Sequence, residues 1–277
     1  MQDIRKERID LLLVDKGLAA SREKAKRLIM AGLVFVDQQR IDKPGTFVQR
    51  DAVIQVKGEE NPYVSRGGLK LEKAIKNFSI PVKSRIWLDV GASTGGFTHC
   101  LLLHGAKKVY SLDVGYGQLA WELRQDPRVV VMERTNVRNI NIEDFTDPIH
   151  GIAIDVSFIS LKLVLPVVNN LLDNKGHIIS LIKPQFEVGK GKVGKKGVVR
   201  DKRLHFEVLV EIMKFARSLN LKIVNLDFSP ITGPEGNIEF LAHFYKGNDI
   251  PAINDYESLS RDIVCNAHNY FTIQTGD

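Results

Sequence analysis

Cysteine is scarce in this sequence, and the scarcity excludes two kinds of structure. Two cysteines, Cys100 and Cys265, occur in 277 residues, which is too few for a disulfide framework or a four-thiolate zinc site. We therefore expect two reduced thiols and no metal-binding set. Long apolar runs are also lacking. The most apolar longer stretch, residues 152–168, contains Asp155, Lys162 and Pro166, whereas a helix that spans a bilayer needs about 20 predominantly apolar residues.

The amino terminus lacks the pattern of a secretory signal peptide. Charged residues recur from Asp3 through Asp10, and the apolar stretch Leu11–Val14 is too short for the hydrophobic region of a signal. A secreted or membrane-inserted protein is therefore disfavoured, and we expect a cytoplasmic protein without a membrane partner.

The composition is that of a folded protein, and its positive charge is unevenly distributed. Hydrophobic residues make up 44% of the chain and charged residues 26%, which excludes wholesale disorder and fibrous repeats. Residues 1–80 hold 16 basic and 11 acidic side chains, and residues 181–203 hold eight basic and two acidic ones. Two separated basic segments suit the binding of one polyanion on two surfaces. A solvated, lysine-rich surface is the alternative.

The first 60 residues have the pattern of a small α+β module. Residues Glu7–Lys16 place apolar side chains on one helical face, and a second helix begins after Ser21 and ends before Gly32. Short β-like runs follow at Leu33–Val36 and Ala52–Val56. The module is therefore expected to fold as two helices against a few short strands.

The order of small and charged residues in this module closely resembles that of the S4 RNA-binding domain. The resemblance covers about residues 7–58 and is carried by Arg8, Asp10, Gly17, Ser21, Arg22, Ala25, Gly32, Val34 and Val36. In that family the second helix and the adjoining loop contact RNA phosphates. The resemblance therefore implies RNA contacts by Arg22, Lys26 and Arg27, and Arg8 is a further predicted RNA contact. Alternatively, the three side chains of the second helix only keep a small helix soluble.

A second candidate RNA contact is the loop at residues 189–197, where glycines alternate with lysines. Four glycines favour a mobile backbone, and four lysines are suited to phosphate contacts: Lys190, Lys192, Lys195 and Lys196. Arg66, which precedes two glycines, is a further predicted RNA contact. A disordered, solvated insertion is the alternative for the loop.

From residue 86 onward, strand-like runs alternate with helical patterns. Seven runs have strand character, at residues 86–90, 109–113, 129–132, 151–155, 178–182, 223–228 and 238–245. This alternation predicts an α/β fold whose mostly parallel sheet is covered by helices on both faces. We expect an S4-like domain, a linker, a seven-stranded domain and a helical extension, at residues 1–60, 61–85, 86–250 and 251–277 respectively.

A glycine-rich turn follows the first strand of this seven-stranded domain. Its glycines are suited to a close approach between the backbone and a ligand. The turn lacks the dinucleotide fingerprint G-x-G-x-x-G, because Ser93 stands where the second glycine would fall. Asp113, at the end of the second strand, is placed to accept both ribose hydroxyls of a nucleoside. The combination resembles the S-adenosylmethionine site of Rossmann-like methyltransferases, which implies a donor site made of Asp89, Gly91, Ala92, Ser93, Thr94, Gly95, Gly96, Phe97 and Asp113.

Four charged residues outside this turn are placed for chemistry on a ligand. Asp155 ends strand four, Lys183 ends strand five and Glu239 opens strand seven, while Lys70 precedes the sheet. Because ligands bind beyond the carboxyl ends of parallel strands, Asp155 and Lys183 share one edge, and Glu239 joins them if the last strand is antiparallel. Each residue taken alone is more often part of a surface salt bridge. The order Lys–Asp–Lys–Glu resembles the catalytic tetrad of the FtsJ (RrmJ) family of RNA ribose 2′-O-methyltransferases.

The chemistry of a ribose hydroxyl explains why such a group is needed. The hydroxyl is a poor nucleophile, and a lysine that has lost its proton can accept the hydroxyl proton as the oxygen attacks a methyl group. A second lysine favours that proton loss, whereas carboxylates orient both amines and oppose it. We assign Lys183 as the base or hydroxyl-orienting group and Asp155 as its closest partner, with Lys70 and Glu239 completing the ring.

Two other methyl-transfer reactions fit the sequence less well. Methylation at C5 of a pyrimidine needs a cysteine nucleophile near strand four, and neither cysteine is placed there. Transfer to an exocyclic amine usually employs an Asp/Asn-Pro-Pro-aromatic turn after strand four, where this chain has Asp155-Val156-Ser157-Phe158. Both comparisons leave the sugar hydroxyl as the acceptor.

An S4-like module joined to an FtsJ-like domain is the architecture of the TlyA family, also called the hemolysin A family. The chain resembles that family further at residues 65–71, 91–98 and 183–187, and at Arg85-Ile86-Trp87-Leu88, which departs from the family's Arg-x-Trp-Val only at Leu88. The resemblance implies S-adenosylmethionine-dependent 2′-O-methylation of cytidine in bacterial ribosomal RNA, with ribosomal RNA or a ribosomal subunit as the partner. It leaves open which subunit's RNA is modified. The alternatives are a secreted or membrane-active haemolysin, and an RNA-binding ribosome-assembly factor with a silent methyltransferase fold.

Overall fold

Contacts within the computed structural model divide the chain into two units, residues 1–62 and residues 63–277. The structure describes residues 6–30, 32–57, 61–189, 191–194 and 197–275. The N-terminal unit has one hydrophobic core and the C-terminal unit has two, one on each face of its sheet. The division falls between Pro62 and Tyr63, inside the segment 61–85 for which we expected a linker.

The N-terminal unit is a small α+β fold. Its elements are β1 (Lys6–Arg8), α1 (Ile9–Asp15), α2 (Arg22–Met30), β2 (Val34–Val36), β3 (Gln39–Ile41), β4 (Phe47–Gln49) and β5 (Ile54–Val56). β2 pairs with both β3 and β5, and β1 pairs with β4, all antiparallel. Apolar side chains of both helices and of the strands, such as Leu12, Leu28 and Val34, form the core. The two predicted helices and two β-like runs are confirmed, whereas β1, β3 and β4 have no counterpart in the prediction.

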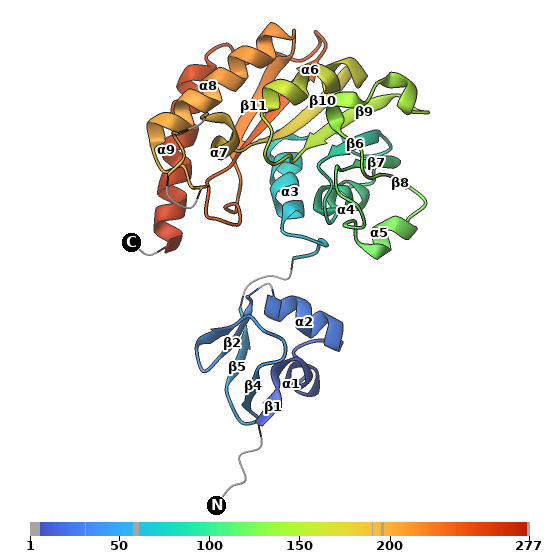
Figure 1. Ribbon diagram of the computed structural model, residues 1–277. Helices are drawn as coiled ribbons and strands as arrows, with labels where there is room; N and C mark the ends of the chain where they lie inside the picture. Colours follow the sequence, from blue (N-terminus) through green and yellow to red (C-terminus); the bar gives the residue numbers. More distant parts are fainter. Residues whose placement is uncertain (1–5, 31, 58–60, 190, 195–196, 276–277) are drawn as a thin grey trace, which may run out of the picture. The chain divides into compact units, whose positions relative to one another are not determined.

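The C-terminal unit is built on a seven-stranded, mostly parallel sheet (Figure 1). The strands are β6 (Ile86–Val90), β7 (Lys108–Leu112), β8 (Val129–Met132), β9 (Ile149–Ile154), β10 (Leu172–Ile182), β11 (Lys222–Phe228) and β12 (Phe240–Lys246), in the order β11-β12-β10-β9-β6-β7-β8. β12 runs antiparallel to β10 and β11, and the other pairs of this sheet are parallel. The predicted α/β class and its seven strands are confirmed.

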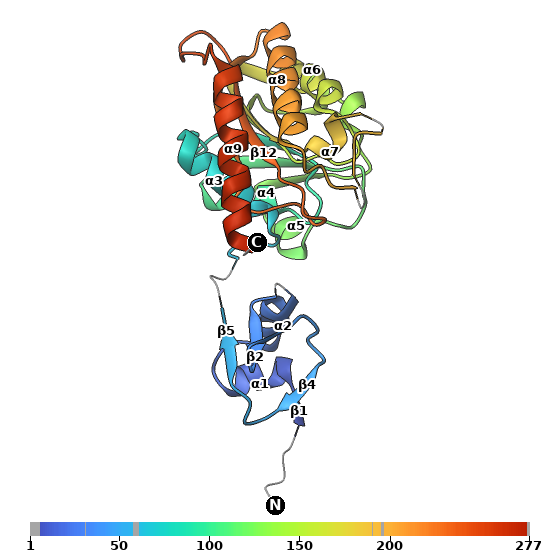
Figure 2. The same ribbon diagram turned by 90° about the vertical axis from the view of Figure 1, so that its left-hand side faces the viewer.

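Helices cover both faces of this sheet (Figures 1 and 2). One face packs against α6 (Leu161–Leu171), α8 (Lys202–Ser218) and α9 (Tyr256–Thr275), and the other against α3 (Gly67–Phe78), α4 (Gly96–Leu103) and α5 (Trp121–Gln125). Shorter helical turns connect the elements: η1 (Val137–Asn139), η2 (Ile142–Asp144) and α7 (Pro184–Glu187). Successive residues of a strand enter opposite cores, as Phe240 and Leu241 do. Within the described residues, no helix combines enough length with enough apolar character for a membrane span.

Helix α3 lies inside the segment that we expected to be a linker. Its buried residues include Leu71, Ala74 and Ile75, which recur at helical spacing. These side chains belong to the core that α3 shares with α4. Residues 67–78 are therefore a packed helix of the C-terminal unit rather than part of a linker.

The direction of β12 brings its first residue to the edge where β10 ends. Ile182, the last residue of β10, pairs with Phe240, the first residue of β12. Lys183 and Glu239 adjoin this pair, so both lie at the carboxyl edge of the parallel strands. The condition for placing Glu239 in the predicted site, an antiparallel last strand, is met.

Candidate active site

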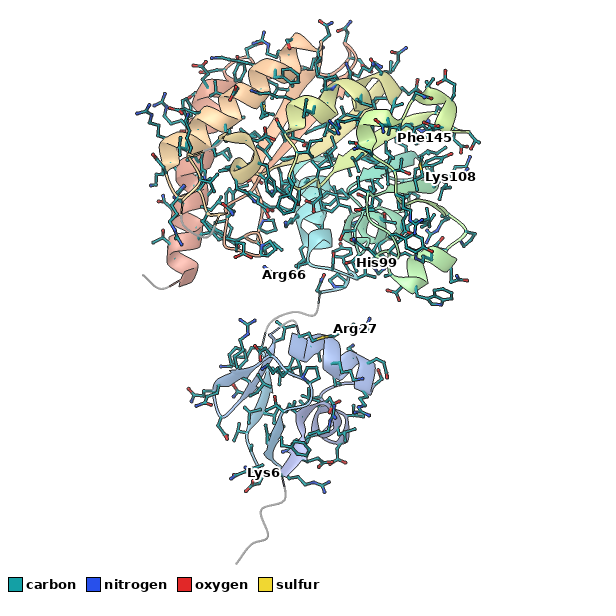
Figure 3. The ribbon with its side chains drawn as sticks, viewed as in Figure 1. Lys6, Arg27, Arg66, His99, Lys108 and Phe145 are labelled. Atoms are coloured by element: carbon teal, nitrogen blue, oxygen red, sulfur yellow. The ribbon has the colours of Figure 1, made fainter. Side chains whose placement is uncertain are left out.

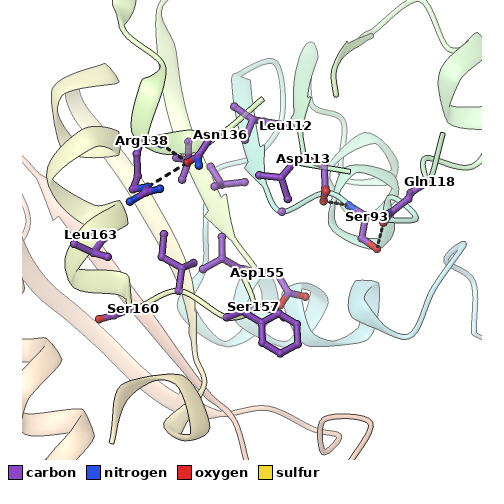
Figure 4. Close-up of a pocket in the computed structure, with 17 residues that line it drawn as sticks. Ser93, Leu112, Asp113, Gln118, Asn136, Arg138, Asp155, Ser157, Ser160 and Leu163 are labelled. Atoms are coloured by element: carbon purple, nitrogen blue, oxygen red, sulfur yellow. Dashed lines mark hydrogen bonds between the residues drawn. The ribbon is translucent and has the colours of Figure 1, made fainter. Parts of the chain in front are cut away.

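Two cavities adjoin the glycine-rich turn at the carboxyl edge of the sheet. The first, here called the large cavity, has a volume of about 740 Å³ and is lined by the ends of β6 and β7 and by residues that follow β9 (Figure 4). The second, called the tetrad cavity, has a volume of about 350 Å³ and contains all four members of the predicted tetrad. Four residues line both cavities: Gly91, Ser93, Asp155 and Ser157.

Two glycines of the turn are required by contacts within the protein. Gly91 has a φ of +89°, and a Cβ atom there would lie 2.5 Å from the carbonyl oxygen of Asp155. Gly95 has a φ of +100°, and a Cβ atom there would overlap the side chains of Leu119 and Leu123. We expected these glycines to allow the close approach of a ligand. At both positions the close approach is between segments of the protein, although Gly91 also lines the two cavities.

The predicted donor-site residues divide between the two cavities. The large cavity is lined by Gly91, Ser93 and Asp113 of this set, and the tetrad cavity by Gly91, Ala92, Ser93, Thr94, Gly96 and Phe97. Gly95 and Asp89 line neither cavity. Asp89 is fully buried beneath the turn. Its Oδ2 accepts hydrogen bonds from the backbone nitrogen and the hydroxyl of Thr98, at 2.9 and 2.7 Å. Burial raises the pKa of Asp89 to about 7 against the lowering effect of these bonds, and the carboxyl group holds α4 against β6.

Asp113 lies in the large cavity and organises its rim. Its Oδ2 accepts a hydrogen bond from the backbone nitrogen of Ser93 at 2.8 Å, and its Oδ1 accepts one from that of Gly115 at 2.7 Å. The hydroxyl of Ser93 donates in turn to Oε1 of Gln118 at 3.3 Å (Figure 4). Each carboxylate oxygen of Asp113 keeps a lone pair for a ligand. The nucleoside contact predicted for this residue therefore has an acceptor group in the cavity.

Lys183 and Asp155 form one ion pair of the tetrad cavity. Nζ of Lys183 lies 2.6 Å from Oδ1 of Asp155 and donates a hydrogen bond to Oγ of Ser157 at 3.0 Å. The two charged side chains are 11% and 20% exposed. The structure thus brings Lys183 and Asp155 together and adds Ser157, which we did not single out from the sequence.

Lys70 and Glu239 form a second and more deeply buried pair. Nζ of Lys70 lies 2.5 Å from Oε2 of Glu239, and the side chains are 9% and 2% exposed. Burial raises the pKa of Glu239, while the positive charges of Lys70 and Lys183 oppose that rise. The partners are 169 residues apart in the chain. All four predicted residues therefore meet in one cavity, as two ion pairs of unequal burial.

Two aromatic side chains beside the tetrad were missed in the sequence. Phe158 lines the large cavity with a side chain that is 91% exposed, and its φ is +63°. Its ring centroid lies 5.0 Å from that of Phe186 in α7. A left-handed backbone is uncommon for a bulky residue and tends to occur at functional positions. The sequence did offer a signal for Phe158, since an aromatic residue stands three positions after Asp155. We considered that segment only for its lack of prolines.

Glu187 fastens the segment after β10 to the segment after β9. Its Oε2 accepts a hydrogen bond from the hydroxyl of Ser160 at 2.6 Å, and its Oε1 accepts one from the backbone nitrogen of Leu161 at 2.8 Å. Burial raises the pKa of Glu187, and the bond from Leu161 opposes that rise. Glu187 thus adds to the contacts that already join the two segments: the Lys183–Asp155 ion pair, the Lys183–Ser157 hydrogen bond and the Phe158–Phe186 pair.

The predicted RNA contacts of the N-terminal unit are partly engaged inside that unit. Asp10 is fully buried, and its carboxylate pairs with Arg8 at 3.0 Å and with Arg22 at 2.9 Å. The hydrogen bond from Arg8 lowers the pKa of Asp10 to about 2, which outweighs the opposite effect of burial. Arg27 lies on α2 (Figure 3) and is exposed, whereas Lys26 is half-buried. Arg8 and Arg22 therefore neutralise a buried charge, while Arg27 is free of such a role.

The other predicted RNA contacts belong to the C-terminal unit. Arg66 is exposed directly before α3 and lines the tetrad cavity (Figure 3). Lys192 is exposed in the glycine–lysine loop. Lys190, Lys195 and Lys196 lie outside the described residues.

Family models match both units of the chain. The model of the FtsJ-like methyltransferase matches residues 63–246, and the model of the S4 domain matches residues 7–54. The FtsJ-like match begins at residue 63, which is also the first residue of the C-terminal unit. The likeness of each unit to its family, stated from sequence motifs alone, is confirmed.

Relatives and a solved structure are similar over most of the chain. YqxC of Bacillus subtilis is 54% identical over 254 residues, which are 89% of this chain and 90% of that protein. The 16S/23S rRNA (cytidine-2′-O)-methyltransferase TlyA of Mycobacterium tuberculosis is 46% identical over 85% of this chain and 88% of that protein. A solved structure from Streptococcus thermophilus, described as a hemolysin, superposes on this chain with a TM-score of 0.78. The two sequences are 46% identical, and the match covers 99% of this chain and all of that one. The chain therefore belongs to the TlyA (hemolysin A) family, whose members join an S4 domain to an FtsJ-like methyltransferase.

Proposed function

We propose that this enzyme transfers a methyl group from S-adenosylmethionine to the 2′-hydroxyl of a cytidine in ribosomal RNA, in the cytoplasm. The observation that carries the proposal is the meeting of two Lys–carboxylate pairs in a cavity that shares a wall with a larger one. Donor and acceptor then occupy neighbouring spaces that adjoin at Gly91, Ser93, Asp155 and Ser157, where the methyl group would pass directly from one to the other. The relatives of Mycobacterium tuberculosis and Campylobacter jejuni, named as rRNA (cytidine-2′-O)-methyltransferases, support the sugar position and the base.

The large cavity has the chemistry that S-adenosylmethionine requires. Asp113 offers acceptors to ribose hydroxyls, and Leu112, Val137 and Ile159 offer apolar surface to an adenine ring. Ser93 lines the part of this cavity that adjoins the tetrad cavity. When bound, the donor supplies a methyl group activated by a sulfonium.

Lys183 is the group that handles the proton of the ribose hydroxyl. When its amine is unprotonated, Nζ accepts the hydroxyl proton, and it orients the hydroxyl oxygen through a hydrogen bond. Asp155 and Ser157 both contact this nitrogen and fix its position.

Phe158 provides a stacking surface for the target nucleotide. Its exposed ring is supported from one side by Phe186. Sequence-specific RNA recognition stacks splayed-out bases on aromatic rings, and such stacking contributes about 1–3 kcal/mol per base. We infer that the base of the target nucleotide stacks on Phe158 while its ribose enters the tetrad cavity.

Basic side chains of each unit hold the RNA by its phosphates. The set includes Lys26 and Arg27 in the N-terminal unit, and Arg66, Lys190, Lys192, Lys195 and Lys196 in the C-terminal unit. Arg8 and Arg22 share the single carboxylate of Asp10, so together they keep one net positive charge for the same role. Each phosphate contact lowers the logarithm of the affinity by about 0.7 to 0.9 per tenfold rise in salt. Because Arg27 has a surface position without the internal role of Arg22, its replacement should flatten the salt dependence without loss of stability.

Replacing Lys183 tests the proposed base. Lys183→Met keeps the length of the side chain and removes its charge, so methyl transfer to ribosomal RNA should fall by about 100-fold or more. Affinity for S-adenosylmethionine in calorimetry should be unchanged, because Lys183 does not line the large cavity. Lys175→Met is the matched control, since Lys175 is an exposed lysine near the other end of β10. The labelled RNA should resist alkaline cleavage at one internucleotide bond, because a 2′-O-methyl group blocks that cleavage.

Three outcomes of this experiment would contradict parts of the proposal. Full turnover by Lys183→Met would remove Lys183 from the base role. A label on the nucleobase would exclude the 2′-hydroxyl as acceptor. A wild-type protein that binds donor and RNA without transferring a methyl group would be a silent RNA-binding factor.

A further inference from the structure

A third cavity, of about 560 Å³, lies next to the tetrad cavity. Its walls come from residues 198–200 ahead of α8, from the loop 230–238 ahead of β12, and from α9. Arg66, Ile231 and Thr232 line both this cavity and the tetrad cavity. The tetrad cavity and this neighbouring space, called here the flanking cavity, therefore adjoin each other at these three residues.

The walls of the flanking cavity are held in place by buried polar side chains. Asn237 is 2% exposed; its Oδ1 accepts a hydrogen bond from the backbone nitrogen of Val199 at 3.0 Å, and its Nδ2 donates one to the carbonyl oxygen of Gly197 at 2.9 Å. On the other side, Nε2 of His205 lies 3.0 Å from the carbonyl oxygen of Val199, and its Nδ1 lies 2.9 Å from Nε2 of His268. These contacts tie the three wall segments together, so the cavity is formed in advance of any ligand.

The lining combines positive charge with apolar and aromatic surface. Arg66 and Arg200 are exposed, and neither forms an ion pair with a carboxylate in the described part of the chain. The rest of the wall is largely apolar, with Val198, Val199, Ile231, Ile238 and the aromatic Phe271. An unneutralised guanidinium binds a phosphate well, and an apolar and aromatic wall accepts the face of a nucleobase.

We propose that the flanking cavity binds the nucleotide next to the methylated one in the RNA chain, with Arg66 and Arg200 on its phosphates. Its volume falls within the range of about 300–1,000 Å³ that is typical of ligand sites. Arg66 stands on the wall shared with the tetrad cavity, where the phosphate that joins two consecutive nucleotides would lie. The site gives the enzyme a means of reading sequence or shape beyond the target base. This inference rests on the proposed function, because it takes RNA as the substrate.

Filling the flanking cavity tests the inference with a matched control. Thr272→Trp places an indole on the lining, whereas Ile273→Trp places the same group at the next position of α9, which is 81% exposed and does not line the cavity. Affinity is measured for a ribosomal RNA fragment that contains the methylated nucleotide, and for two fragments with an abasic site directly before or after it. One abasic fragment should bind the wild type and Ile273→Trp about tenfold more weakly than the intact fragment, in the range of lost base stacking. Thr272→Trp should bind the intact fragment with a similar loss and should show almost no further loss with that abasic fragment.

Replacing Arg200 gives a second readout that does not depend on the indole being tolerated. Arg200→Gln should flatten the plot of log affinity against log salt by about 0.7, the value for one phosphate contact to a single strand. Arg203→Gln is the control, since Arg203 pairs with Glu207 and does not line the flanking cavity. Equal abasic penalties in Thr272→Trp and Ile273→Trp, or an unchanged salt slope in Arg200→Gln, overturn the inference. The salt slope of Arg200→Gln can be measured with any single-stranded ribosomal RNA fragment and needs no methyl transfer. An inactive wild type would therefore refute the proposed function, while this slope would still decide whether the flanking cavity holds an RNA phosphate.

Discussion

Removing one partner of the Lys70–Glu239 pair should destabilise the C-terminal unit far more than removing both. The side chains are 9% and 2% exposed, with their charged atoms 2.5 Å apart. Lys70→Met leaves the carboxyl group of Glu239 buried without its ion-pair partner, and Glu239→Leu leaves the ammonium group in the same position. Breaking a buried pair on one side costs about 3–5 kcal/mol. We therefore expect each single variant to lose about 3 kcal/mol or more of unfolding free energy.

The double variant separates the net contribution of the pair from the cost of breaking it. The pKa of Glu239 is raised, so burial outweighs the attraction of the neighbouring lysines. Because the pKa of Glu239 is higher in the folded protein than in the unfolded chain, its carboxyl group stabilises the fold at a pH below the unfolded pKa. This stabilisation is lost as the pH rises through the folded pKa. The attraction within a buried ion pair is largely offset by the cost of removing both charges from water. Lys70→Met/Glu239→Leu should unfold within about 1 kcal/mol of wild type, since apolar replacement of a buried pair is often neutral or stabilising.

Tryptophan fluorescence during urea unfolding measures this unit selectively, because both tryptophans, Trp87 and Trp121, belong to it. Methyl transfer should be lost in all three variants, whereas donor affinity should be kept, because neither residue lines the large cavity. Lys183→Met is the comparison for stability and should lose less than the single variants, because its pair is more exposed. The reasoning is refuted if the costs of the two single variants simply add in the double variant, since the two side chains would then stabilise the fold independently.

Three further predictions concern other parts of the structure. The hydrogen bond from Arg8 lowers the pKa of Asp10 to about 2. Above pH 4, Asp10 should therefore contribute about 2 kcal/mol to the unfolding free energy of the N-terminal unit, and this contribution should be lost as the pH falls from about 4 to 2. Hydrogen exchange of α1 should show the loss in the wild type and not in Asp10→Asn. Asp113→Ala should weaken S-adenosylmethionine binding about tenfold or more in calorimetry, as expected for the loss of hydrogen bonds to a charged group, whereas Asp126→Ala, outside the large cavity, should not. Glu187→Ala removes the acceptor for Ser160 and Leu161 and should lower stability by about 1 kcal/mol. It should also lower kcat, with most of the activity restored in Glu187→Gln; an unchanged kcat would leave Glu187 with a purely structural role.

The parts of the site that follow from strand ends could be predicted from the sequence. Asp155 and Lys183 follow β9 and β10, which pair in parallel, so both reach one edge of the sheet. Glu239 required the direction of one strand, which the sequence could state only as a condition and which the pairing of Ile182 with Phe240 meets. Lys70 was placed by family resemblance. Nothing in the local periodicity of α3 shows that this lysine reaches a carboxylate 169 residues away.

The parts that could not be predicted depend on contacts between distant segments. Arg8 and Arg22 resemble phosphate contacts, because a guanidinium pairs equally well with a phosphate and with a carboxylate. Only the fold shows that Asp10 is buried between them. Phe158 likewise has no distinguishing local pattern, since its exposure and its left-handed backbone are properties of the folded turn. The flanking cavity joins three segments that no motif connects.

The four tetrad residues do not have equal positions, although their order in the sequence presents them as one set. Asp155 and Ser157 line both the large cavity and the tetrad cavity, and both contact Nζ of Lys183. Lys70 and Glu239 line the tetrad cavity only and are more deeply buried. Under the proposed function, a methyl group that passes from the large cavity to the tetrad cavity crosses the side at which Asp155 lies, so we expect the Lys183–Asp155 pair to meet the reacting atoms. We expect the buried pair to act on them only through its charge. Its removal should therefore abolish turnover and leave donor binding intact.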